Sequence, residues 1–158
     1  MSSLLVQACS KSKNQPEEAT PALELYSGYF FKIIKKSMRE GTFDEQMDIY
    51  ILSAEHGLID ADTDIGWYNK RMDRSQAAEL APSVQSKLRN IVTDTYDEVI
   101  INVGNTYQQA LGDVSEFVDS EIYYVEGEGI GHKGHILKRA IRGERELLIE
   151  EPTPAADQ

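Results

Sequence analysis

Four short apolar runs, each followed by a polar loop, constrain the fold of this chain more than any other feature of its sequence. The runs occupy residues 4–8, 47–52, 98–102 and 121–125. Between them, apolar residues recur at every third or fourth position, which is the spacing of an amphipathic helix. This alternation of strand and helix predicts an α/β fold, a three-layer sandwich with a mostly parallel four-stranded sheet.

Helix patterns fill the segments between these strands. Helices are expected over residues 22–39, 75–95 and 135–142, with a further short helix that ends at Leu111. Gly41 follows the first of them, and a glycine just beyond the apolar pattern is a common helix end. Residues 60–72 fit neither pattern and are expected to form an irregular loop in which Trp67 and Tyr68 are exposed, as aromatic residues of binding loops often are.

Length and composition favour a single domain. The chain has 158 residues, of which 41% are hydrophobic, so we expect one α/β domain over residues 1–149 and a disordered acidic tail over residues 150–158. The single cysteine excludes an internal disulfide and a cysteine-based zinc cluster. No window has the roughly 18 apolar residues of a membrane span, and the N-terminus lacks a signal-peptide pattern. We therefore expect a reducing, cytoplasmic location without membrane association.

The net charge restricts the partners. Asp and Glu number 27 against 16 Lys and Arg, which gives a formal charge of −11. This charge disfavours non-specific adhesion to nucleic acid, although a basic patch still acts locally, within a Debye length of about 10 Å. Any site for a polyanion must therefore be local.

The first polar loop, Cys9-Ser10-Lys11-Ser12-Lys13, places lysines and hydroxyls directly after a buried strand. Such a loop suits a phosphate or another anion, and Cys9, Ser10, Lys11 and Lys13 are substrate-binding candidates. The spacing is not that of a Walker loop, so ATP hydrolysis is disfavoured. The alternative is a solvated loop with a buried structural cysteine.

The second loop follows Ser53, a further binding candidate, and places His56 beside a glycine. An imidazole at a strand end can donate a proton or hold a leaving group, but it can equally be a hydrogen-bonded structural residue. Aspartates follow at positions 60, 62 and 64, without the glycine and distal glutamate of an EF-hand loop, so no metal site is expected. Asp62 is the candidate catalytic carboxylate, and the other two are interpreted as surface charge.

The third and fourth loops supply amides and glycines. The candidates are Gly104 and Asn105 in the third loop and Gly127, Gly129 and Lys133 in the fourth. An asparagine amide can read the edge of a base or cap a helix, and the nearby Tyr107 can stack on a base or fill the core. Glycine at every other position before a helix lets backbone amides approach a phosphate, with a flexible hairpin as the alternative.

All four loops follow the carboxyl ends of predicted strands. In open parallel sheets, ligands bind outside these ends. We therefore expect the four loops to form one composite site.

In its motifs the chain resembles DUF6884, an uncharacterised family. The matching segments are Cys9-Ser10-Lys11-Ser12-Lys13, Tyr26-Ser27-Gly28, Ser53-Ala54-Glu55-His56-Gly57-Leu58, Asp62, Tyr68 and Gly127-Glu128-Gly129-Ile130-Gly131. That family looks related to the uracil-DNA glycosylase-like fold and to domains associated with archaeosine and 7-deazaguanine enzymes, which implies recognition or removal of a nucleobase. The glycosylase motifs Gly-Gln-Asp-Pro-Tyr and His-Pro-Ser-Pro are absent, so catalytic roles do not carry over from them.

The leading hypothesis is an enzyme that hydrolyses the N-glycosidic bond of a modified base in a nucleotide or nucleic acid, without metal or cofactor. Asp62 would stabilise an oxocarbenium-like state, His56 and Asn105 would hold the departing base, and Tyr68 or Trp67 would stack on it. The alternative is a non-catalytic module that binds the same ligand. A third possibility, a phosphotransferase or nuclease, would require a divalent metal.

Overall fold

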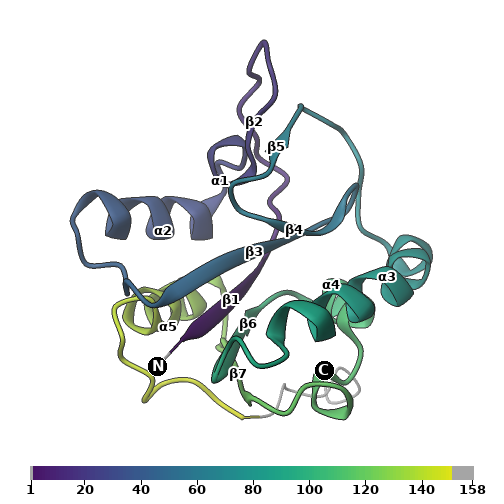
Figure 1. Ribbon diagram of the computed structural model, residues 1–158. Helices are drawn as coiled ribbons and strands as arrows, with labels where there is room; N and C mark the ends of the chain where they lie inside the picture. Colours follow the sequence, from purple (N-terminus) through teal and green to yellow (C-terminus); the bar gives the residue numbers. More distant parts are fainter. Residues whose placement is uncertain (1, 151–158) are drawn as a thin grey trace.

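A five-stranded mixed sheet forms the centre of the protein (Figure 1). The computed structural model describes residues 2–150, so the predicted tail lies outside the described residues apart from Glu150. The strands are β1 (Ser3–Ala8), β3 (Met47–Ser53), β4 (Gly57–Asp60), β6 (Glu98–Asn102) and β7 (Glu121–Tyr124), in the order β4-β3-β1-β6-β7. β1 pairs in parallel with β3 and β6, and β6 pairs in parallel with β7.

β4 is the strand that the apolar pattern did not predict, so the expected count of four is wrong by one. It folds back on β3 as an antiparallel hairpin that pairs Ser53 with Gly57 and Tyr50 with Asp60. Gly57 has a φ of +74°, a left-handed conformation that glycine adopts at little cost. The sheet is therefore mixed, with four parallel strands and one antiparallel edge strand.

Alternate residues of the central strand fill two separate cores. Leu4 and Val6 pack under α3 (Arg74–Val92) and α4 (Asn105–Leu111), whereas Leu5 packs under α2 (Tyr29–Arg39) and α5 (Ile130–Ala140). Figure 1 shows these two pairs of helices on opposite sides of the sheet. A strand that is buried on both faces has a continuous run of apolar residues, which explains the four apolar runs of the sequence. The predicted α/β class is confirmed.

The helix expected over residues 22–39 is interrupted. α1 (Ala22–Leu25) is separated from α2 by Tyr26-Ser27-Gly28, and Tyr26 has extended dihedrals, φ −80° and ψ 134°. Tyr26 forms a backbone bridge with Lys13 of the first loop. This pairing outweighs the helical periodicity, which continues through the break.

Two further helix boundaries differ from the prediction. α3 begins after Asp73, whose side chain accepts a 2.8 Å hydrogen bond from the Gln76 amide and caps the helix. α5 begins at Ile130, earlier than the expected residue 135, and includes Gly134. A Cβ at Gly134 would come within 2.5 Å of the Tyr29 ring, so glycine allows α5 to approach α2.

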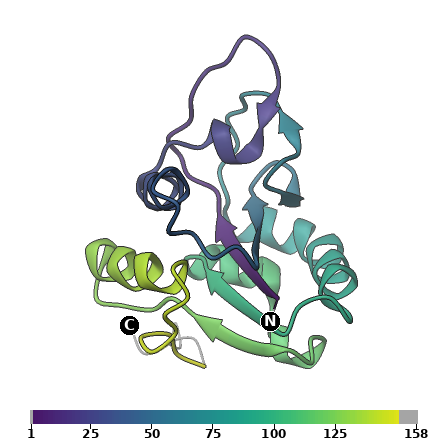
Figure 2. The same ribbon diagram turned by 60° about the vertical axis from the view of Figure 1, so that its left-hand side comes forward.

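A small lobe extends beyond the carboxyl ends of the parallel strands. In it, β2 (Thr20–Pro21) pairs antiparallel with β5 (Asp64–Ile65), next to α1. The segment 60–72, expected to be irregular, therefore contains a two-residue strand. Figures 1 and 2 show this lobe above the sheet, connected to the end of β1. A 3₁₀ turn, η1 (Val114–Glu116), precedes β7.

The winding of the chain reverses at β1. From β1 the chain passes through α1 and α2 to β3 on one side, and after β4 and α3 it returns to β6 on the other side. The loops that leave β1 and β6 diverge at such a point, and a crevice opens between them. Within residues 2–150, no helix combines the length and the apolar character needed to cross a membrane.

Candidate functional site

Two adjoining hollows open at the carboxyl ends of β1 and β6, where the winding reverses. The first, of about 510 Å³, lies between these strand ends and the start of α5, and the second, of about 470 Å³, lies between the first loop and residues 69–72. Cys9 and Tyr107 line both hollows. We therefore treat the two hollows as one site, the rim cleft.

A larger hollow, of about 730 Å³, lies at the opposite edge of the sheet, before β6 and β7. Its lining includes four carboxylates, Asp94, Asp97, Asp119 and Glu121. These repel the anions that the first loop was predicted to bind. The rim cleft is therefore the candidate site.

Cys9 and Tyr107 meet at the centre of the rim cleft. The Cys9 Sγ lies 3.1 Å from the Tyr107 phenol oxygen, and either group can donate the hydrogen bond. Burial raises the pKa of the Tyr107 phenol above its ordinary value, and the charge and hydrogen bond of Cys9 act in the same direction. Tyr107 is therefore a neutral phenol, able to donate a hydrogen bond, throughout the neutral pH range.

A pair of buried amides joins the two strand ends beneath the first hollow. Asn102 Nδ2 donates a 2.9 Å hydrogen bond to Gln7 Oε1, and the two residues are only 2% and 1% exposed. Buried amides are tolerated only when they are paired. This pair therefore holds the carboxyl ends of β1 and β6 in register below the rim cleft.

Ser10 attaches the first loop to α2. Its Oγ accepts a 3.1 Å hydrogen bond from the Gly28 amide and donates a 2.6 Å bond to the Ser12 carbonyl. A Cβ at Gly28 would lie 2.5 Å from the Ser10 Cβ, so a glycine is needed for this approach. At the other end of the loop, the Lys13 ammonium lies 4.6 Å from the centre of the Tyr68 ring, a cation–π contact.

A group of hydroxyls supports the loop from behind. The Tyr68 phenol oxygen lies 2.6 Å from that of Tyr26 and 3.0 Å from Ser53 Oγ, and the His56 ring packs edge-on against Tyr68 at 5.4 Å. Burial raises the pKa of Tyr26 to about 12 and raises that of Tyr68 as well. Because the Lys13 ammonium lies over one face of the Tyr68 ring, Tyr68 supports the loop and does not offer that face to a base.

The rim cleft is cationic although the protein is acidic. The Lys and Arg side chains that line it are Lys11, Lys13, Lys70, Arg71 and Lys133. No carboxylate among the described residues lines either hollow. The start of α5 also lines the cleft, and the amides of a first helical turn have no partner within the helix. These groups together suit an anion.

Most of the predicted binding residues lie together. Those that line the rim cleft are Cys9, Ser10, Lys11, Lys13, Gly104, Gly127, Gly129 and Lys133. Gly129, with a φ of +147°, precedes α5 and requires glycine. The other two predicted binding residues, Ser53 and Tyr68, lie behind the first loop.

The predicted catalytic residues are more scattered. Asn105 is the first residue of α4, directly after Gly104 on the cleft wall. His56 is exposed and packs against Tyr68. Asp62 lies outside the rim cleft, on an exposed turn where its amide donates to Asp60 Oδ1 at 2.8 Å. Because β4 runs antiparallel, the chain has moved away from the carboxyl edge when it reaches Asp62.

The sequence did not predict three residues that line the rim cleft, namely Gln7, Lys70 and Arg71. Two adjacent cations close to exposed aromatic residues, and one amide within an apolar run, were the signals that could have identified them. In the part of the chain that the structure describes, no group of three or more His, Cys, Asp or Glu side chains is placed to hold a metal ion.

Comparison with known proteins identifies a family. Among solved structures, the chain is similar to the crystal structure of AF0587, described as a protein of unknown function, with a TM-score of 0.52 and 12% sequence identity. The similarity covers 88% of this chain but 44% of that one, so the chain spans less than half the length of AF0587, and the likeness concerns the fold alone. No curated protein matches the chain. A model of the family of unknown function DUF6884 matches residues 4–139, which include every loop of the rim cleft, and the chain therefore belongs to DUF6884.

Proposed function

We propose that the protein binds a nucleotide, or a nucleic acid that carries a modified base, in the rim cleft and hydrolyses its N-glycosidic bond. The observation that carries the proposal is the charge of the cleft, where five cations and no carboxylate of the described residues line the two hollows of a chain with a formal charge of −11. Phosphate suits such a site, because lysines and a helix N-terminus both favour negative charge.

The first hollow also has room and apolar walls for a base. Its volume of about 510 Å³ falls within the range of small-molecule sites. Phe30, Tyr107 and Ile130 contribute apolar surface, and Asn102 contributes an amide. A ligand with a ring and a phosphate would use both parts of the cleft, which favours a nucleotide over inorganic phosphate.

Hydrolysis would break the bond between C1′ and the base nitrogen. The hydroxyl of a water molecule bonds to C1′, and the base leaves with the bonding electron pair and takes up the remaining proton. The neutral Tyr107 phenol can donate a hydrogen bond to the departing base, and Asn105 lies at the adjacent wall. The lysines would hold the phosphate and so position the sugar.

A non-catalytic binding module is the second candidate. It is favoured by one observation: no carboxylate among residues 2–150 lines the hollows, whereas glycosidic hydrolysis commonly uses one. The two candidates share the ligand and differ only in whether the base is released.

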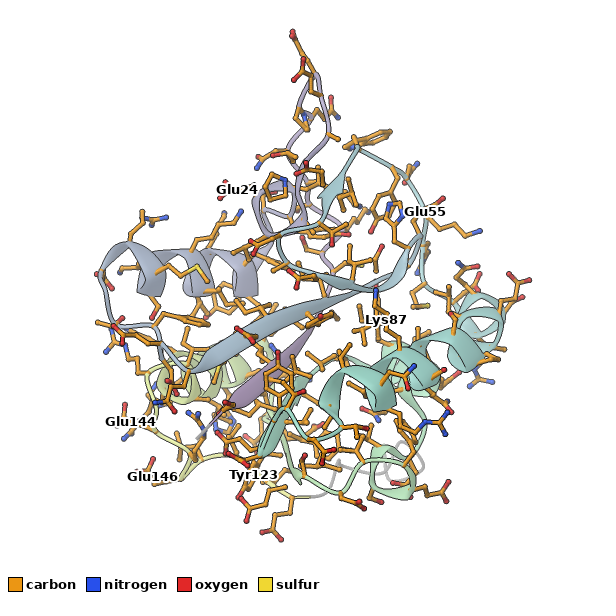
Figure 3. All side chains as sticks on the ribbon, viewed as in Figure 1. Glu24, Glu55, Lys87, Tyr123, Glu144 and Glu146 are labelled. Carbon is orange, nitrogen blue, oxygen red and sulfur yellow. The ribbon has the colours of Figure 1, made fainter. Side chains whose placement is uncertain are left out.

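Binding and release can be measured separately. Calorimetry would measure the affinity for each standard nucleoside 5′-monophosphate, and mass spectrometry would detect free base after incubation with nucleotides and with cellular nucleic acid. We expect Lys133→Gln to weaken binding roughly 10- to 150-fold, because a charged hydrogen bond contributes about 1.5–3 kcal/mol. Lys87→Gln, on α3 across the sheet from α2 and α5, is the matched control and should bind as the wild type does (Figure 3).

Tyr107→Phe should suppress release of the base and leave affinity nearly unchanged. Asp62→Asn should change neither quantity, and a loss of release would instead show that this carboxylate reaches the substrate. Binding without release in the wild type would identify a binding module, and the absence of binding to every nucleotide and nucleic acid would refute both candidates.

Two broader expectations belong to the same proposal. A uracil-DNA glycosylase-like relationship is supported by the position of the cleft at the carboxyl ends of parallel strands. We also expect a cytoplasmic location, where the proposed ligands, nucleotides and nucleic acid, would be accessible to the protein.

A further inference from the structure

A further hollow lies between α2 and α5, and it shares no lining residue with the rim cleft. Its volume is about 320 Å³, and we name it the basic groove. The side chains that define it are Tyr29 and Lys36 on α2, and His135, Lys138 and Arg142 on or just after α5. α5 begins in the rim cleft, which Ile130 and Lys133 line, and then runs along the groove. Figure 2 shows α2 and α5 next to each other on one side of the sheet.

The two helices concentrate the positive charge of the protein. They carry seven of the 16 Lys and Arg residues and no Asp or Glu, so the rest of the chain has nine basic and 27 acidic residues. Lys36, Lys138 and Arg142 are exposed, and Glu40 is the one carboxylate of the described residues that lines the groove. Glu40 is 3.9 Å from Arg142, and among the described residues neither Lys36 nor Lys138 forms an ion pair with a carboxylate.

An aromatic ring lies in the groove beside these cations. Tyr29 is 44% exposed and rests against α5 at Gly134, where a Cβ would come within 2.5 Å of the ring. An exposed ring beside lysines is the arrangement with which proteins bind single strands, since the ring stacks on a base and the cations contact phosphates.

We propose that the basic groove binds the backbone of a single nucleic-acid strand whose target base enters the rim cleft, so that the ligand is a polymer and not a free nucleotide. This inference rests on the proposed function. The eleven residues of α5 extend about 16 Å, enough for several nucleotides. A single strand is favoured over a duplex because its bases are open both to the Tyr29 ring and to the cleft. It is favoured over an anionic membrane because the cations line a hollow between two helices, one of which, α5, also lines the cleft.

The salt dependence of binding tests the groove. Strands of about 12 nucleotides, one oligothymidylate and one oligouridylate, would be titrated by fluorescence anisotropy between about 50 and 200 mM salt. Removing three phosphate contacts should reduce the slope of log K against log salt by about 2, because each contact on a single strand contributes roughly 0.7. The groove variant combines Lys36→Gln, Lys138→Gln and Arg142→Gln. The matched control combines Arg74→Gln, Lys87→Gln and Arg89→Gln on α3, with the same change in net charge.

We expect the lower slope in the groove variant alone, with its affinity for uridine 5′-monophosphate unchanged from that of the wild type. Tyr29→Leu should weaken strand binding roughly 5- to 150-fold, as the loss of a stacked base does. The comparison of thymidylate with uridylate shows whether DNA or RNA supplies the backbone.

Several results would overturn the inference. They are an unchanged slope in the groove variant, an equal decrease in the α3 control, and binding to phosphatidylserine vesicles that depends on the same three groove residues. If nucleoside monophosphates bind the wild type but strands bind no more tightly, the groove proposal fails while the proposed function stands. If neither binds, the proposed function fails first.

Discussion

Replacing Gly28 with alanine should destabilise the protein through a collision with the first loop of the rim cleft. The Cβ of the alanine would lie 2.5 Å from the Ser10 Cβ and 2.9 Å from its Oγ, both closer than such atoms approach in proteins. The backbone dihedrals at Gly28, φ −69° and ψ 174°, are accessible to alanine, so the expected cost comes from this contact and not from strain in the main chain.

The magnitude follows from two terms. Overpacking a close contact costs about 1–3 kcal/mol. Displacement of Ser10 would also weaken its 3.1 Å hydrogen bond from the Gly28 amide, which contributes about 0.5–1.5 kcal/mol. We therefore expect Gly28→Ala to lower the free energy of unfolding by about 2–4 kcal/mol, as measured by urea denaturation.

A matched glycine and a double-mutant cycle isolate the collision. Gly104 precedes α4 as Gly28 precedes α2, also in extended conformation, and a Cβ there would meet nothing within 4 Å, so Gly104→Ala should cost less than about 1 kcal/mol. Ser10→Gly removes the colliding atoms, so Gly28→Ala should cost at least about 1 kcal/mol less in the Ser10→Gly background. Equal costs for the two alanine variants, or simple additivity in the cycle, would refute the reasoning.

Two further predictions concern ionisation. Burial raises the pKa of Tyr26 to about 12, from about 10 in the unfolded chain, so its neutral form contributes stability that is complete below pH 10 and is lost towards pH 12. Tyr26→Phe should therefore remove up to about 3 kcal/mol of the decline in the free energy of unfolding between these pH values. Denaturant unfolding at several alkaline pH values measures this decline, and the same dependence on pH in the variant and the wild type would contradict the assignment. Arg145→Gln should lower the free energy of unfolding by about 3–5 kcal/mol, because it leaves the Glu98 carboxylate, which is 4% exposed and 2.7 Å from the Arg145 guanidinium, buried without its partner. Adding Glu98→Gln should recover part of this stability, as measured by thermal unfolding. No recovery in the double variant would contradict the account.

The parallel strands could be predicted because burial on both faces imposes continuous apolar runs. Val99-Ile100-Ile101 in β6 is such a run, and all three residues are almost inaccessible to solvent. β4 could not be predicted in the same way, because it contributes only Leu58 and Ile59 to the core. The break at Tyr26 was missed for a related reason: it is imposed by a pairing with Lys13, a contact that local periodicity does not contain.

The position of the candidate site followed from the same geometry. Carboxyl ends of parallel strands share one edge, so the loops after β1, β6 and β7 had to meet there. The reasoning failed for the turn that contains Asp62, because the unpredicted β4 carries the chain back from that edge. Lys70 and Arg71 reach the cleft through a loop without periodic structure, and no local pattern specifies where such a loop returns.

The central claim is that the loops after three separate strands bind one phosphate-bearing nucleoside. Amide chemical shifts of isotopically labelled protein, followed during titration with each standard nucleoside 5′-monophosphate, test it most directly. The account predicts that residues 9–13, 103–107 and 127–133 shift together and saturate at a common dissociation constant. Shifts confined to the hollow at residues 93–97 and 117–121, or different dissociation constants for the three loops, would contradict it.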